Sequence, residues 1–98
     1  MNETMLAYVK LTLRIKTDAY DDEISNLISS ALLDLGIAGV VIPENLDSIL
    51  KQAVATYVKM NFGSLMEYER RQLKESYDEQ KAQLSMCSSY TDFEVTNG

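Results

Sequence analysis

The stretch DDEISNLISSALLDL, residues 21–35, has the strongest periodic pattern of the chain. Its apolar residues recur at spacings of 0, 3, 4, 7, 8 and 11, the pattern of one face of an α-helix; they are Ile24, Leu27, Ile28, Ala31, Leu32 and Leu35. Asp18 or Asp21 can cap the start of this helix, and the acidic residues 21–23 suit the positive end of its dipole. Gly36 is expected to end the helix, because glycine commonly follows the last helical residue.

A second helix is expected after the short apolar connector formed by residues 36–42. Pro43 suits the first helical position, and Asp47 then falls in the first turn. The apolar residues of 46–58 repeat with helical spacing as clearly as those of the first helix. This helix is expected to end at Gly63.

Residues 65–85 predict a third, longer helix with a narrow apolar stripe, carried by Met66, Leu73, Tyr77 and Leu84. At about 1.5 Å per residue, such a helix is a rod of about 30 Å. A rod with so few apolar residues either extends beyond the core to meet another chain or lies on the surface as an ordinary amphipathic helix.

The two ends of the chain are ambiguous. Residues 9–16 alternate between apolar and polar, which slightly favours a strand, whereas Leu6, Val9 and Leu13 also fit one face of a helix. Residues 85–98 contain no Lys or Arg and have some strand character. Such a tail is either frayed or completed by a neighbouring molecule.

Length and composition limit the possible functions. The chain has 98 residues, enough for one small domain, and 46% of them are hydrophobic. The net charge of −6 argues against free binding to nucleic acid, which needs a basic surface. The chain has no His and one Cys, so a catalytic dyad or a common metal site is not expected. We therefore expect no enzyme, no cofactor and no metal.

The ends and the hydropathy give no sign of a membrane protein. No run of about 18 apolar residues is present, so no membrane span is expected. Residues 1–16 lack the basic region, apolar block and cleavage site of a signal peptide.

The acidic cluster at residues 18–23 could be interpreted as a cation site. It lacks the ligand spacing, the central Gly and the distal Glu of a calcium loop, so helix capping explains it better. Arg70 and Arg71 could bind a phosphate group, but neighbouring glutamates favour a solvated surface.

Charge is segregated along the chain. Residues 1–16 carry three basic and one acidic residue (+2), residues 17–50 carry seven acidic and no basic residues (−7), and residues 51–98 carry six basic and seven acidic residues (−1). Complementary segments can pair head-to-tail between copies, although both can equally face water. If copies pair, we expect a contact between acidic residues of one subunit and basic residues of the next: Asp21, Asp22 and Glu23 against Lys10, Arg14 and Lys16.

Several short motifs are similar to those of a known family. Leu13-Arg14-Ile15, the acidic start at residues 18–24 and the later stretch from Pro43 to Gly63 resemble the small head–tail connector, or adaptor, proteins of tailed bacteriophages. The resemblance covers residues 5–84 and includes no catalytic signature.

The resemblance implies an all-α subunit, with residues 5–15 as a helix. We therefore predict one domain over residues 1–84, a small bundle of about four helices, one short and N-terminal and three longer. An extended or strand-like tail over residues 85–98, partly flexible, follows it.

The resemblance also implies an assembly. About a dozen copies would form a ring beneath the portal protein and join it to tail-completion proteins, with double-stranded DNA passing through the channel without sequence recognition. The subunit would lie at the head–tail junction of the virion, and in the host cytoplasm before assembly. Candidate partner contacts are Arg70, Arg71, Tyr77, Tyr90 and Phe93. The alternative is a small helical DNA-packaging accessory or regulatory module that contacts DNA or protein directly.

Overall fold

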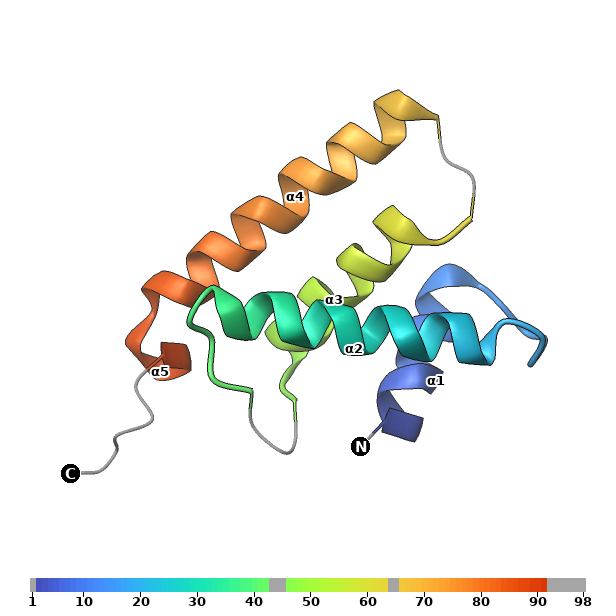
Figure 1. Cartoon of the computed structure of the whole chain (residues 1–98), viewed down its shortest axis with the longest axis horizontal. Coiled ribbons are helices and arrows are strands. Elements are labelled where there is room, and N and C mark those ends of the chain that lie inside the picture. The colour runs from blue at the N-terminus through green and yellow to red at the C-terminus, as the bar shows by residue number, and fades with distance from the viewer. Residues whose placement is uncertain (1, 43–45, 64–65, 92–98) are drawn as a thin grey trace.

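The computed structural model describes residues 2–42, 46–63 and 66–91, and the elements within them are all helices (Figure 1). The five helices, in chain order, are α1 (Asn2–Leu13), α2 (Asp21–Ile37), α3 (Ser48–Asn61), α4 (Glu67–Met86) and α5 (Ser88–Thr91). The predicted all-α bundle, with one short N-terminal helix and three longer ones, is confirmed.

Helix α3 is the centre of the bundle, because it packs against α1, α2 and α4. Figure 1 shows α2 lying across the front of α3, α1 behind α2, and α4 running as a long rod from the end of α3 to α5. Among the described residues, no helix is long and apolar enough to cross a membrane.

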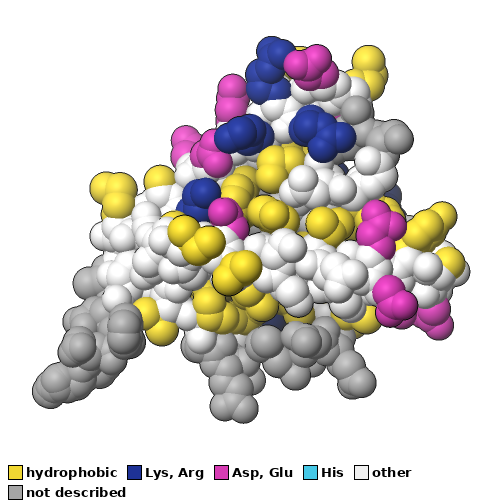
Figure 2. Space-filling view, in the orientation of Figure 1, with side chains coloured by type: hydrophobic (Ala, Val, Ile, Leu, Met, Phe, Trp, Pro, Cys, Tyr) yellow, Lys and Arg dark blue, Asp and Glu magenta, His cyan; other side chains and the backbone are white. Residues whose placement is uncertain are grey.

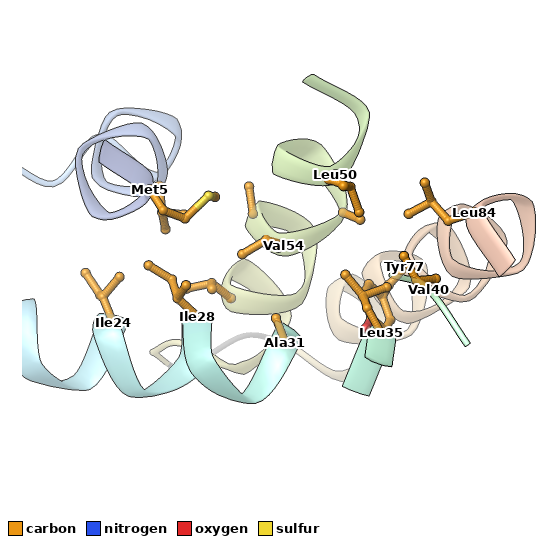
Figure 3. Close-up of a cluster of buried hydrophobic side chains, with 14 residues drawn as sticks. Met5, Ile24, Ile28, Ala31, Leu35, Val40, Leu50, Val54, Tyr77 and Leu84 are labelled. Atoms are coloured by element: carbon orange, nitrogen blue, oxygen red, sulfur yellow. The ribbon is translucent and has the colours of Figure 1, made fainter. Parts of the chain in front are cut away.

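The core has two parts joined at the crossing of α2 and α3 (Figure 3). In the first part, Met5 of α1 lies against Ile24 and Ile28 of α2. The second part closes the other end of α2 against the connector and α4, with Leu35, Val40, Tyr77 and Leu84. Each fully buried Leu, Ile or Val side chain contributes about 1.5–3 kcal/mol, so these two clusters hold the bundle together.

The end of α2 differs from the prediction. The helix continues through Gly36 to Ile37, and the residue in the left-handed conformation is Gly39, with φ of +99°. The Val40 N–H donates to the Leu35 carbonyl (3.0 Å) and the Gly39 N–H to the Gly36 carbonyl (3.0 Å), the two bonds of a Schellman motif. Val40 is buried with Leu35, and this contact sets the stop at Gly39.

The predicted caps at the start of α2 are also wrong. Tyr20 occupies the N-cap position, and no side-chain cap bond is present there. The Asp18 side chain is instead drawn to Lys10 of α1. The acidic first turn, residues 21–23, still favours the positive end of the helix dipole.

Helix α3 begins at Ser48 rather than at Pro43, which lies outside the described residues. Asp47 is its N-cap, and one carboxylate oxygen accepts a hydrogen bond from the Leu50 N–H at 2.9 Å. Because this bond satisfies an otherwise unpaired N–H group of the first turn, Asp47 outcompetes the weaker proline signal. The predicted end is confirmed: Gly63, with φ of +76°, follows the last helical residues.

The N-terminal segment is helical, as the family resemblance implies, and the alternating pattern is misleading. A strand would place Val9 and Leu11 on the same face, but Val9 is fully buried and Leu11 is 78% exposed. Helix α1 ends in the same Schellman motif as α2, with Ile15 N–H donating to the Lys10 carbonyl (2.9 Å). Here the left-handed residue is Arg14, with φ of +61°, in place of the usual glycine.

The first part of the predicted tail is helical rather than extended. α4 reaches Met86, and α5 follows after one residue. Tyr90 attaches α5 to the rest of the chain: its hydroxyl donates to the Asp47 carboxylate (2.7 Å), and its carbonyl accepts from the Val41 N–H (2.7 Å). Phe93 lies outside the described residues.

Candidate subunit interface

The turn between α1 and α2 gathers most of the predicted interface residues at one end of the subunit. The Lys10 ammonium lies 2.9 Å from an Asp18 oxygen and 2.7 Å from an Asp21 oxygen of the same chain. The hydrogen bonds to Asp21 and Asp18 raise the pKa of Lys10 above its ordinary value. Lys10 and Asp21 therefore hold α1 against α2 within one subunit.

The other four predicted interface residues are exposed at the same end. Asp22, Glu23, Arg14 and Lys16 form no ion pair with any residue of the described chain. The left-handed conformation at Arg14 fixes the direction in which its side chain leaves the backbone. These four side chains are free to meet a second molecule.

The outer face of α2 adds a surface that the sequence analysis missed. Asp22, Asn26, Ser29, Leu33 and Ile37 recur at spacings of 0, 4, 7, 11 and 15, on the side opposite the buried stripe. Leu33 is 67% exposed and Ile37 is 78% exposed. The sequence feature that could have indicated this surface is the run of ten uncharged residues, 24–33. A surface helix ordinarily carries charges on its outer face.

Tyr77, which the sequence placed in the apolar stripe of α4 and also among the candidate partner contacts, is a core residue of the subunit. It is 2% exposed, and its hydroxyl donates to an Asp34 carboxylate oxygen at 2.6 Å. The Lys81 ammonium lies 3.1 Å from the same oxygen. The Tyr77 hydrogen bond, helped by Lys81, lowers the pKa of Asp34, while burial and Asp34 raise that of Tyr77. These three groups fasten α4 to the end of α2.

The other candidate partner contacts have different surroundings. The exposed Arg70 donates a hydrogen bond to the Met60 carbonyl at 2.8 Å. This bond ties the start of α4 to the end of α3. Arg71 lies 3.7 Å from Glu67 on the exposed side of α4. Figure 2 shows Lys and Arg side chains gathered over the upper part of the visible face.

A groove of about 610 Å³ runs between α4 and the end of α3. Most of its lining side chains are polar or charged: Lys59, Glu69, Gln72, Glu75, Ser76 and Glu79, with Leu73. Small-molecule sites are usually lined by apolar side chains, so this groove does not resemble one. In the described part of the chain, no group of three or more His, Cys, Asp or Glu side chains could hold a metal ion.

Comparison with protein families gives one assignment. A family model described as "Phage connector protein" matches residues 5–91, which include the charged α1–α2 turn, the outer face of α2 and the Asp34–Tyr77 contact. No curated protein and no solved structure matches the chain. Because the family model spans most of the 98 residues, the chain belongs to the phage connector protein family.

Proposed function

We propose that this protein is a head–tail connector subunit that assembles with copies of itself into a ring beneath the portal. The family match over residues 5–91 carries this proposal, since it assigns the chain to structural connectors of the phage particle. The ring, of about a dozen copies, would link the portal to tail-completion proteins. Before assembly the subunit would lie in the host cytoplasm.

The exposed charges support a contact between copies. Asp22 and Glu23 of one subunit would face Arg14 and Lys16 of the next, because none of these four groups is paired within the described chain. Lys10 and Asp21, which are paired within the subunit, would orient this end rather than make the contact. A contact between two different surfaces of identical subunits closes into a ring when the rotation between them permits.

The charge of the chain suits a DNA channel. With a net charge of −6, the protein would repel the phosphate backbone on average, so DNA could pass through without being held. Contacts to portal or tail proteins would use the exposed start of α4, with Arg70 and Arg71, and the C-terminal segment with Tyr90 and Phe93.

Charge reversal tests the contact. Asp22→Lys with Glu23→Lys turns two attractive pairs into repulsive ones, and we expect assembly to need at least about tenfold more protein. The melting temperature should fall only slightly, because both side chains are exposed and lose only their interaction with the positive end of the α2 dipole. The matched control is Glu75→Lys with Glu79→Lys on α4, which should assemble normally. Sedimentation velocity of the chain, alone and with the portal protein of its phage, measures assembly.

The alternative function, direct DNA binding, has its own result in the same set of experiments. A DNA-packaging accessory would bind duplex DNA with an affinity that falls steeply with salt. Binding of that kind without assembly on the portal would contradict the connector proposal.

A further inference from the structure

We infer that the outer face of α2, centred on Leu33 and Ile37, is the apolar core of the contact between neighbouring subunits and that it receives the outer side of α1 of a second copy, centred on Leu11. This inference rests on the proposed connector function, and it names the two surfaces through which the copies meet.

The α2 surface has the composition of an interface core. Interface cores are depleted in charged residues, and α2 carries none between Glu23 and Asp34. Leu33 and Ile37 lie one turn apart, and they are 67% and 78% exposed. Figure 2 shows hydrophobic side chains on the visible face over the C-terminal part of α2. Water contact at these side chains is unfavourable, so covering them would favour association.

The α1 surface matches it in both apolar and charged character. Leu11 is 78% exposed on α1, and Arg14 and Lys16 follow it in sequence. On α2 the order is reversed: Asp22 and Glu23 come first, and Leu33 lies about 15 Å further along the helix. With α1 of one copy antiparallel to α2 of the next and Leu11 against Leu33, the chain after Leu11, which carries the long side chains of Arg14 and Lys16, runs towards Asp22 and Glu23.

The geometry of a single subunit makes the two surfaces different faces. α1 and α2 pack against each other through Met5 and Val9 on one side and Ile24 and Ile28 on the other. Their outer sides therefore point away from each other, and Figure 1 shows α1 behind α2. Each copy offers one surface of each kind, so the contact repeats from copy to copy, as a ring requires.

Two complementary variants test this arrangement. Leu33→Ser with Ile37→Ser damages the α2 surface, and Leu11→Ser damages the α1 surface. Each should raise the protein concentration needed for assembly at least tenfold without lowering the melting temperature, because the side chains are exposed. The control is Met86→Ser, which removes an 83% exposed side chain on α4 and should assemble normally.

Mixing the two variants gives the sharper result. One intact α1 surface and one intact α2 surface remain in the mixture, so we expect heterodimers that do not grow into rings, while each variant alone stays monomeric. Normal assembly of the Leu33→Ser, Ile37→Ser variant, or a mixture that associates no better than its components, would overturn the inference.

A second measurement reports the contact even when association is weak. A spin label at Ala7→Cys, on the exposed side of α1 and in a Cys87→Ser background, should broaden the amide signals of residues 29–37 in an added isotope-labelled copy. Broadening elsewhere, or none, contradicts the inference. If this broadening is seen but the unchanged protein does not bind the portal protein, the connector proposal is wrong while the inference about the two surfaces stands.

Discussion

Replacing Arg14 with glycine should make the folded monomer more stable and the assembly of copies weaker. Arg14 holds the left-handed conformation, φ +61°, at the end of α1, where the equivalent motif of α2 uses Gly39. That conformation costs a residue other than glycine about 1–2 kcal/mol. Glycine avoids this cost, but it lowers the stability of the fold by about 0.4–1 kcal/mol because it gives the unfolded chain greater conformational freedom. Arg14→Gly should therefore stabilise the monomer, by about 0.5–1 kcal/mol.

Urea unfolding of the monomer and thermal melting measure this gain. For a domain of this size, 1 kcal/mol corresponds to about 4–8 °C, so the melting temperature should rise by roughly 2–8 °C. The same variant removes the guanidinium proposed to meet Asp22 or Glu23 of a neighbour, so assembly should weaken. Arg14→Ala is the control, because it loses the guanidinium but keeps a Cβ in the left-handed conformation; it should assemble poorly without becoming more stable.

Two results would contradict these expectations for Arg14. If Arg14→Gly unfolds at a lower urea concentration than the unchanged protein, the arginine side chain stabilises the fold and its conformation is not a cost. If both variants assemble at the usual concentration, Arg14 lies outside the contact between copies.

The remaining predictions concern the fold itself and can be measured by denaturation. Tyr77→Phe removes the hydroxyl that donates to Asp34 and should cost about 1–2 kcal/mol in urea unfolding; no loss would mean that water replaces this bond. Asp47→Ala removes the α3 cap and should cost about 1–2 kcal/mol, whereas Asp47→Asn should cost less. Leu35→Ala should cost about 2–5 kcal/mol, against less than about 0.5 kcal/mol for the exposed Leu33→Ala. Folding lowers the pKa of Asp34 and Asp47, so the stability that they contribute is present above their unfolded value near 3.8 and is lost as the pH falls through their folded values. Melting at pH 3 should therefore occur at a lower temperature than at pH 6, and Asp34→Asn with Asp47→Asn should reduce that difference.

The long helices were predictable because their periodicity extends over many residues. Ile24 to Leu35 and the stripe around Tyr77 and Leu84 fall on single faces, and the structure buries most of those residues. Helix ends were less predictable, because neighbouring signals compete over short distances. Gly36 and Gly39 carry the same local signal, and the burial of Val40, a tertiary contact, selects the second.

The interface residues were harder to predict, because a charge pattern does not distinguish pairing within a chain from pairing between chains. Lys10 and Asp21 are eleven residues apart, and the turn after α1 brings them together in one subunit. Tyr77 fits both a core stripe and a partner contact until its burial is known. The exposure of Leu33 was not evident from the sequence, because its neighbour Leu32 fits the buried stripe. The exposed face of α2 was therefore recognised only in the three-dimensional structure.

Electron microscopy of this protein mixed with the portal protein of its own phage tests the connector role most directly. We expect a second ring of density, coaxial with the portal, built from repeated copies of this chain. That ring should be lost with the Leu33→Ser, Ile37→Ser variant, in which the proposed α2 surface is damaged. Portal particles that show no added density when the unchanged protein is present in large excess would contradict the connector role.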